Sequence, residues 1–307
     1  MAKIIAMMNQ KGGVGKTTSS VNLAACLAVA EKKTLLIDLD PQGNGSISIG
    51  LSKEKFAGRN IYHALIGQIS LRDAIYESEL PCFDICPSDN NLSGAEIELV
   101  SLFARESKLK NAFKSVEKDY DYIIIDCPPS LGLLTVNALN AAHSYIVPMQ
   151  TEFLAMEGLA QLLNTVKLIR NSLNPDLELD GILLTMYDSR SGLHKQVANE
   201  IKTHFGDVVF NTIIPRNVKL AECPSFGKPI ILYDIESKGS EAYLALAKEL
   251  ILKERFKGNS KENSKETSAK NNGSSNINVE KEVLLPEEVL LDKLPALENI
   301  NIDVNQI

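Results

Sequence analysis

The chain has no tryptophan, and aromatic residues make up only 6% of its 307 residues. Proteins that bind single-stranded nucleic acid without sequence preference stack bases on aromatic side chains, so this mode of binding is not expected. Basic residues are not in excess either, because 32 Lys plus Arg face 39 Asp plus Glu and give a net charge of −7. A uniformly basic surface is therefore excluded, and any contact with duplex DNA must use a local patch.

Long apolar runs and a signal peptide are also lacking. No run approaches the roughly 20 residues that span a bilayer, and the start MAKIIAMMNQ has no cationic n-region. The cysteines are odd in number and scattered, at Cys26, Cys82, Cys86, Cys127 and Cys223. We expect free thiols in a reducing cytoplasm. Only two of them lie close together, with no second pair following, which favours buried strand thiols at Cys82 and Cys86 over a metal site.

Short apolar runs alternate with helical patterns along most of the chain. The runs are Lys3–Met8, Thr34–Ile37, Tyr122–Ile125, Ser144–Pro148, Gly181–Thr185 and Val208–Ile214. Helical patterns extend to Ala30 and cover Leu133–Ala142, Gly158–Asn171 and Ser191–Phe205. Continuous apolar strands between helices predict an α/β fold, a mostly parallel twisted sheet with helices on both faces. Binding sites in such sheets lie at the carboxyl ends of the strands.

The composition divides the chain into three parts. Residues 1–256 form the predicted α/β domain. Residues 257–279 are rich in Ser, Asn, Lys and Glu, and we expect a disordered linker because so little apolar surface can be buried there. Residues 280–307 form an acidic and apolar tail, in which Pro286 followed by two glutamates suits a helix start. A helix that docks on the domain, a partner-binding peptide and a disordered tail all remain open.

A Gly-rich loop, NQKGGVGKTT at residues 9–18, follows the first strand and precedes the first helical pattern. Glycines let the backbone wrap an anion and turn its N–H groups inward, and the helix N-terminus adds a favourable dipole. We expect Lys16 to reach the β- and γ-phosphates and Thr17 to offer its hydroxyl to Mg²⁺. The first glycine of the usual GxxxxGK[ST] pattern is replaced by Gln10, and an extra lysine, Lys11, precedes two glycines.

The segment KGGVGKTT resembles the deviant Walker A box of the ParA/MinD/nitrogenase-iron-protein group. The resemblance implies a P-loop NTPase fold, ATP and Mg²⁺ as ligands, and ATP hydrolysis with weak intrinsic activity. It also implies an ATP-dependent homodimer in which Lys11 crosses to the nucleotide of the partner, a role that makes physical sense because a second cation stabilises the transferring phosphate. The expected nucleotide-binding residues of the loop are Lys11, Gly12, Gly13, Val14, Gly15, Lys16, Thr17 and Thr18.

Three carboxylates accompany the loop. LLIDLDPQGN ends a strand with Asp38 and Asp40, and YIIID ends another with Asp126, the Walker B arrangement. The resemblance implies that Asp40 orients the attacking water, while Thr17, Asp38 and Asp126 serve the metal. One Asp after a strand is weak evidence, since Asp often starts turns. Three of them together with the loop are strong evidence, and the predicted catalytic set is Lys11, Lys16 and Asp40.

Within the group, the chain is most similar to short ParA/Soj proteins, from Lys3 to about Lys253. The similarity includes DCPPSLGLLTVNAL, EGLAQLLNTV and IPRNVKLAECPSFGKPI. It implies that Pro215 and Asn217 lie near the adenine, although Pro-Arg-Asn is also ordinary turn chemistry. No paired cysteines suit an iron–sulfur cluster. The C-terminal 50 residues carry five Lys against nine Asp plus Glu, unlike a basic membrane-binding helix.

The same resemblance implies non-specific binding of duplex DNA by basic residues of the dimer surface. Arg190 and Lys219 match positions with that role, and Lys195, Lys202 and Arg216 are candidate helpers. Lys and Arg contacts to phosphates are salt-sensitive and blind to sequence. The expected function is nucleoid-associated chromosome or plasmid partition, with hydrolysis stimulated by a ParB-like partner. A switch that positions a non-DNA cargo, or that regulates a replication initiator, would share every nucleotide residue.

Overall fold

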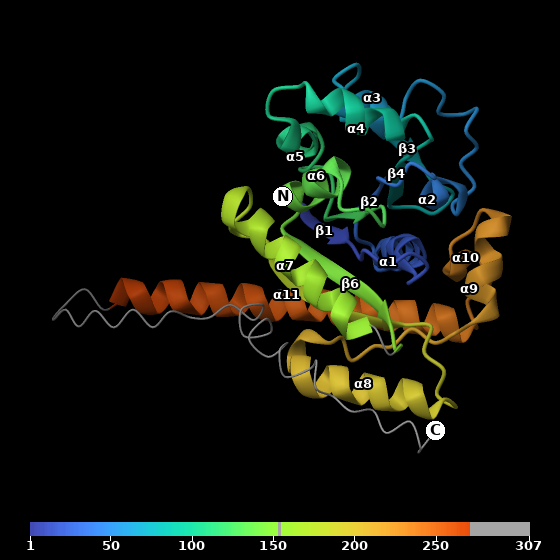
Figure 1. Cartoon of the computed structure of the whole chain (residues 1–307), viewed down its shortest axis with the longest axis vertical. Helices are drawn as coiled ribbons and strands as arrows, with labels where there is room; N and C mark the ends of the chain where they lie inside the picture. Colours follow the sequence, from blue (N-terminus) through green and yellow to red (C-terminus); the bar gives the residue numbers. More distant parts are fainter. Residues whose placement is uncertain (153–154, 271–307) are drawn as a thin grey trace.

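The computed structural model describes residues 1–152 and 155–270, with a seven-stranded sheet at their centre (Figure 1). The strands are β1 (Lys3–Met7), β2 (Thr34–Asp38), β3 (Tyr76–Glu77), β4 (Phe83–Cys86), β5 (Tyr122–Asp126), β6 (Ser144–Gln150) and β7 (Glu178–Thr185). Their order is β3-β4-β2-β5-β1-β6-β7, and only β3 is antiparallel to its neighbour. The mostly parallel sheet predicted from the sequence is confirmed.

The register of the central strands gathers the sequence motifs at one edge. β5 pairs with both β1 and β2, so that Asp126 lies opposite Met7 on one side and opposite Asp38 on the other. Parallel strands end at the same edge of a sheet. The loop that follows β1 and the carboxylates that end β2 and β5 are thereby brought together by main-chain hydrogen bonds alone.

Helices cover both faces of the sheet, as the apolar strands require. The helices are α1 (Lys16–Val29), α2 (Asn44–Ile47), α3 (Ile61–Leu65), α4 (Leu92–Val100), α5 (Lys108–Phe113), α6 (Leu133–Ala141), α7 (Ala155–Ser172), α8 (Gly192–Phe205), α9 (Val218–Glu222), α10 (Ile230–Tyr233) and α11 (Lys238–Lys270). Successive residues of β1 enter opposite cores: Ile4 packs with α3 to α8, and Ile5 packs with α1, α10 and α11. One sheet therefore holds two apolar layers in place.

Two expectations about strands are wrong. Val208–Ile214 is not a strand but the end of a short 3₁₀ turn and a loop, which meets the edge strand β7 at scattered points, such as the hydrogen bonds from the Phe210 amide to Ile182 and from the Ile214 amide to Leu184. Its apolar residues are buried by packing, and scattered hydrogen bonds along a strand edge do not make a ladder. Of the two cysteines expected in a buried strand, Cys86 lies in β4 and is buried, whereas Cys82 lies in the turn before it, exposed and with φ of 64°.

The last helix is longer than the composition of the chain predicts. α11 continues to Lys270, fourteen residues past Phe256, where composition predicts a disordered linker (Figure 1). Extending a helix that has already nucleated costs far less than starting one, so polar residues can continue a helix that packed residues begin. The rest of the expected linker, and the tail of residues 280–307, lie outside the described residues.

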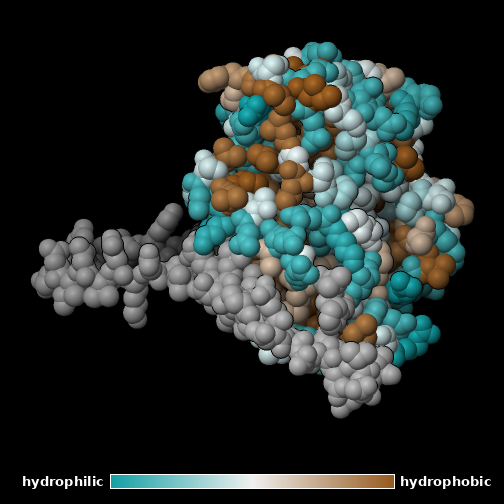
Figure 2. All heavy atoms as spheres, viewed as in Figure 1, coloured by the Kyte–Doolittle hydropathy of each residue, from teal (hydrophilic) through white to brown (hydrophobic). Residues whose placement is uncertain are grey.

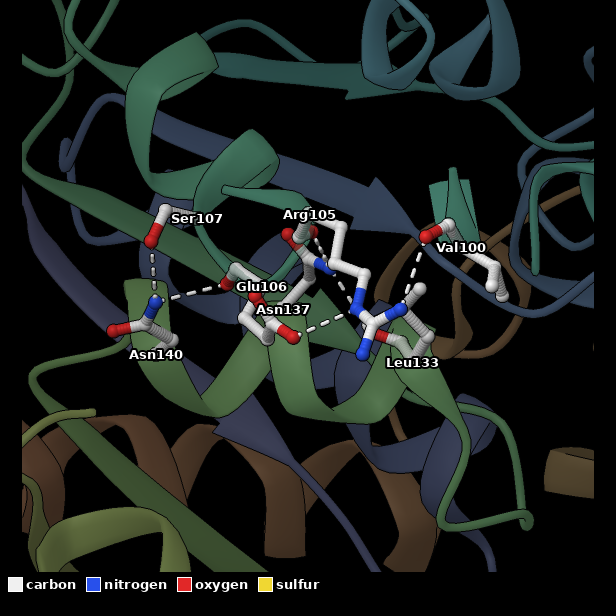
Figure 3. Close-up of polar contacts among 7 residues, drawn as sticks. All are labelled: Val100, Arg105, Glu106, Ser107, Leu133, Asn137 and Asn140. Carbon is white, nitrogen blue, oxygen red and sulfur yellow. Dashed lines mark hydrogen bonds and ion pairs between the residues drawn. The ribbon is translucent and has the colours of Figure 1, made fainter. Parts of the chain in front are cut away.

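Hydrogen bonds fix the connection between α4 and α5 against α6 (Figure 3). Asn137 donates from Nδ2 to the carbonyl of Arg105, and Asn140 donates to the carbonyl of Glu106, each at 2.8 Å. Arg105 in turn donates from Nη1 to the carbonyl of Val100 at 3.0 Å. α6 begins just after the loop that follows Asp126. The same hydrogen bonds therefore also fix the helix at which that loop ends.

The surface is mixed in character. Figure 2 shows hydrophobic residues gathered in the upper part of the face, where Figure 1 draws α4, α5 and α6. Ile97 and Val100 of α4, and Phe103 just after it, are exposed, Phe103 by 95%. Within the described part of the chain, none of the helices is both long and apolar enough to cross a membrane.

Candidate active site

The loop between β1 and α1 has the backbone shape that an anion cradle needs. Gly13 and Gly15 adopt φ of 73° and 83°, in the left-handed region that side chains disfavour. A Cβ added at Gly12 or Gly13 would meet no atom within 4 Å, so both residues border open space. Gly15 is the N-cap of α1, and the cradle thus lies at the N-terminus of a 14-residue helix.

Side-chain hydrogen bonds to the neighbouring strands β6 and β7 brace this loop. Asn9 donates from Nδ2 to the carbonyl of Pro148 at 2.7 Å, at the end of β6. Gln150 donates to the carbonyl of Gly13, and Thr185 of β7 to the carbonyl of Val14, each at 2.8 Å. Gln150 and Thr185 reach the loop from distant strands, and no local motif identifies them. These hydrogen bonds fix the backbone of the loop against β6 and β7.

Lys16 lies inside the site rather than on its rim. Its residue is only 7% exposed, and its Nζ donates to the carbonyl of Lys11 at 3.1 Å. Burial lowers the pKa of this ammonium group, although the nearby Asp126 carboxylate acts in the opposite direction. A buried cation held inside an anion cradle is suited to bind phosphate oxygens.

Asp126 is fully buried and lacks a full set of partners. Its Oδ1 accepts a hydrogen bond from the Ser20 hydroxyl at 2.9 Å, while Oδ2 has no hydrogen-bond partner among the described residues. Burial raises the pKa of Asp126, the adjacent Asp38 raises it further, and the Thr17 and Ser20 hydroxyls lower it. A free carboxylate oxygen beside a threonine hydroxyl suits a small divalent cation, whose charge would offset the cost of burial.

Asp38 and Asp40 differ in what their carboxylates do. Both the amide and the hydroxyl of Ser46 donate to Oδ2 of Asp38 at 2.7 Å, and the Asp40 amide donates to Oδ1 at 3.3 Å. Burial raises the pKa of Asp38 against these hydrogen bonds. Asp38 therefore anchors the segment that carries Asp40. The Asp40 carboxylate accepts one hydrogen bond through Oδ1, from the Gln42 amide at 2.9 Å.

The extra lysine has a different environment. Lys11 is half-exposed, and its Nζ forms an ion pair and a hydrogen bond with the carboxylate of Glu152, just after β6. Sequence reasoning did not identify Glu152. Its carboxylate meets Lys11 only because β6 lies beside β1 in the sheet. Lys11 therefore lies half-exposed on the phosphate loop and is paired with a residue that follows β6.

The segment expected near a base approaches the loop through β7. Pro215 forms a bridge with Tyr187, next to Met186, whose methyl group would lie 3.9 Å from a Cβ at Gly15. Asn217 caps α9, and its Oδ1 accepts hydrogen bonds from the amides of Lys219 and Leu220 at 2.8 and 3.3 Å. The turn chemistry of this segment is thus realised, and its role near an adenine stays a prediction.

The two basic residues expected to contact DNA lie on the surface, each beside a carboxylate. Arg190 is 88% exposed, and its guanidinium forks onto Asp188 with contacts of 3.0 and 2.8 Å. Lys219 pairs with Glu222 at 2.9 Å and lies over the ring of Tyr233. Exposed ion pairs of this kind are weak and salt-sensitive. A phosphate could therefore replace the carboxylate at either residue.

Comparison with known proteins gives a consistent result. A protein-family model described as an AAA domain matches residues 2–179. The chain is 53% identical over 251 residues to the chromosome partitioning protein ParA of Myxococcus xanthus, covering 82% of this chain and 88% of that protein. It is 54% identical over 250 residues to the sporulation initiation inhibitor protein Soj of Bacillus subtilis, covering 81% and 98%.

Solved structures agree with this fold. Cobyrinic acid a,c-diamide synthase from Mycobacterium smegmatis, with bound ADP and magnesium, is 36% identical and superposes with a TM-score of 0.72. The match covers 82% of this chain and 94% of that chain. The same protein is known with a bound ATP analogue and magnesium, at the same identity and TM-score.

Proposed function

Because this chain belongs to the ParA/Soj family of partitioning ATPases, we propose that it is a Mg²⁺-dependent ATPase that dimerises on ATP and binds DNA without sequence preference. In this proposal the dimer drives chromosome or plasmid partition and is associated with the nucleoid. A ParB-like partner stimulates hydrolysis and thereby releases the dimer from DNA. The products of each turnover are ADP and phosphate, formed from ATP and water.

The observation that best supports this function is the meeting of two lysines and three carboxylates at one sheet edge. Residues 12–18 would cradle the phosphates, with Lys16 bound to the β- and γ-phosphate oxygens. Thr17 and Asp126 would hold Mg²⁺, with Asp38 behind them, and the metal would neutralise charge on the phosphates. Asp40 would orient the attacking water, and Lys11 would contact the triphosphate of a second copy. A generic nucleotide-binding site has no need for that extra exposed lysine.

The DNA-binding part of the proposal is supported by the exposure of Arg190 and Lys219. In a symmetric dimer each residue occurs twice, which makes four cations available to phosphates. The Lys at 219 keeps the charge of an arginine but cannot form a bidentate contact with phosphate. Its ammonium group can still exchange Glu222 for DNA at low salt.

Co-sedimentation with random-sequence duplex DNA tests the proposal. We expect retention with ATP and Mg²⁺ and not with ADP or without nucleotide, and a steep loss of binding as salt rises. Changing Arg190 and Lys219 to Ala should reduce the slope of log affinity against log salt by about 3 to 4, because four phosphate contacts are lost per dimer. The nucleotide-driven dimer should persist in this variant.

Arg72→Ala is the matched control, because Arg72 is also exposed and pairs with a carboxylate, that of Asp119. Its slope should equal that of the wild type. If the double variant binds DNA normally, the two residues are solvated surface charges. If the Asp40→Ala variant, in which hydrolysis is blocked, stays monomeric with saturating ATP and Mg²⁺, the partition function is refuted.

A further inference from the structure

An apolar groove lies between the last turn of α1 and the first half of α11. Its volume is about 350 Å³, which is within the range of pockets that bind ligands. Val29 of α1 lines it together with Leu244, Ile251 and Leu252 of α11, and Val29 and Leu252 are 46% and 41% exposed. Apolar side chains that gather in a hollow at the surface mark a place where another chain segment can bind. We call this hollow the α1–α11 groove.

The α1–α11 groove is separate from the nucleotide site. α1 starts at the phosphate loop, whose Gly15 is its N-cap, and the groove is at the other end of the helix. The 14 residues of α1 span about 20 Å. A segment bound in the groove therefore leaves the phosphate loop accessible.

Two cations lie at the α1–α11 groove. Lys248 and Arg255 line it from α11, and both are exposed. Among the residues that the structure describes, neither of them pairs with a carboxylate. Arg190 and Lys219, by contrast, each have a carboxylate partner in their own chain. The groove thus combines apolar surface with unpaired positive charge, and the segment that would complement it is apolar and acidic.

The chain itself carries such a segment after α11. Residues 283–297, which lie outside the described part of the chain, read VLLPEEVLLDKLPAL. Eight of these residues are Val or Leu, and three acidic residues face a single lysine. Apolar side chains in such number favour burial over contact with water. We call residues 283–297 the tail segment.

The tail segment is long enough to reach the groove of its own chain. α11 continues to Lys270 (Figure 1). Its end is 15 residues past Arg255, a distance of about 22 Å along the helix. Residues 271–282 can extend over about 40 Å, which exceeds that distance. A short flexible tether gives an effective concentration on the order of 1 mM, so even weak affinity fills the groove.

We propose that the tail segment docks in the α1–α11 groove of its own chain. Its apolar side chains cover Val29 and Leu252, and its carboxylates neutralise Lys248 and Arg255. This inference is independent of the proposed partition function, because it involves neither the nucleotide nor a second copy.

Tryptophan fluorescence of the full chain tests this inference. Because the chain has no tryptophan, Leu291→Trp places a single reporter in the tail segment. Without nucleotide, we expect emission at shorter wavelength and weaker acrylamide quenching than for the same protein in urea. Both readings should stay constant over a series of protein concentrations, since docking within one chain does not depend on concentration. Emission equal to that in urea overturns the inference, and so does a shift that appears only at high concentration, which would mean docking on a second copy.

A change in the groove tests the place of docking. Leu252→Asp, added to Leu291→Trp, should weaken docking by about 10-fold or more and move the emission to longer wavelength. Leu168→Asp is the matched control, because Leu168 is an exposed leucine of α7, and it should leave the emission unchanged. If neither change affects the emission, or if both change it equally, the tail segment does not occupy this groove.

A charge reversal provides a second test in case Leu252→Asp fails to fold, which far-UV circular dichroism would reveal. Changing Lys248 and Arg255 to Glu should weaken docking by about 3- to 30-fold. Lys167 and Lys202 changed to Glu form the control, because both are exposed on other helices and the net charge changes equally. Docking that is equally strong in the two double variants contradicts the proposed role of the cations and overturns the inference.

Discussion

At the scale of single residues, the site contains two buried carboxyl groups whose charged forms are destabilised by burial. Asp126 and Asp38 are both fully buried, lie opposite each other across two strands, and have pKa values raised by burial. Hydroxyls and Lys16 compensate only in part, because Oδ2 of Asp126 has no hydrogen-bond partner among the described residues. Sites arranged for a ligand often reduce stability in this way.

Asp126→Asn should therefore separate stability from function. The amide has nearly the same shape as the carboxylate and carries no charge, so the ligand-free variant should gain about 0.5–2 kcal/mol in free energy of unfolding. It should at the same time lose Mg²⁺-dependent nucleotide binding. Urea denaturation without ligand and titration calorimetry with ATP and Mg²⁺ measure the two effects. A variant that is less stable and still binds would show that Asp126 is structural.

At the scale of elements, the segment after Asp38 packs directly against the loop between α9 and α10. Gly50 follows α2, and Gly227 ends the 3₁₀ turn Cys223–Phe226, and both have positive φ. A Cβ at Gly227 would lie 2.5 Å from the Cα of Gly50, so the two backbones touch. The carboxylate segment and the segment that carries Lys219 thus share a contact that only glycines allow.

Gly227→Ala should break this contact. Alanine would be strained by the positive φ and would also clash with the backbone of Gly50. Because the two costs are additive, we expect a loss of about 2–4 kcal/mol in free energy of unfolding. Gly67→Ala is the matched control, because Gly67 has φ of 80° and an added Cβ there meets nothing within 4 Å. It should lose only about 1 kcal/mol. Equal losses in urea denaturation would mean that the contact between the glycines contributes nothing.

At the scale of the whole molecule, the amino edge of the sheet gives its stability a pH dependence. His143 precedes β6, and its Nδ1 accepts a hydrogen bond from the Ile4 amide at 3.0 Å. Burial lowers the pKa of His143, and Lys3 lowers it further. The unfolded chain therefore binds a proton at a pH where the folded chain does not, so stability falls as the pH drops below about 6.5.

We expect this fall to reach at most about 1.4 kcal/mol per pH unit for the one histidine. His143→Asn keeps an acceptor for the Ile4 amide but cannot take up the proton. Its free energy of unfolding, measured by urea denaturation between about pH 5.5 and 8, should decline less on the acid side than that of the wild type. Parallel curves for the two proteins would show that His143 does not control acid stability.

The sequence by itself determined the elements and the ligand-binding loop. Apolar runs long enough for strands, alternating with helical patterns, specify a parallel sheet, and the loop glycines with Lys16 specify an anion cradle between strand and helix. These signals are local, because each depends on residues within about one turn or strand of one another. The extension of α11 past Phe256 was not foreseen, and a strand was wrongly expected at Val208–Ile214, because helix extension and strand pairing depend on neighbouring segments.

Only the tertiary structure decided which distant side chains meet. Glu152 lies 141 residues from Lys11, and Thr185 lies 171 residues from Val14, yet each pair is in contact. The strand order that places β6 beside β1 creates the first contact, and the end of β7 reaching the loop creates the second. The local sequence shows which functional groups a site contains. The contacts that hold those groups in position come from chain segments that approach in space, because hydrogen bonds and ion pairs act over a few ångströms whatever the separation along the chain.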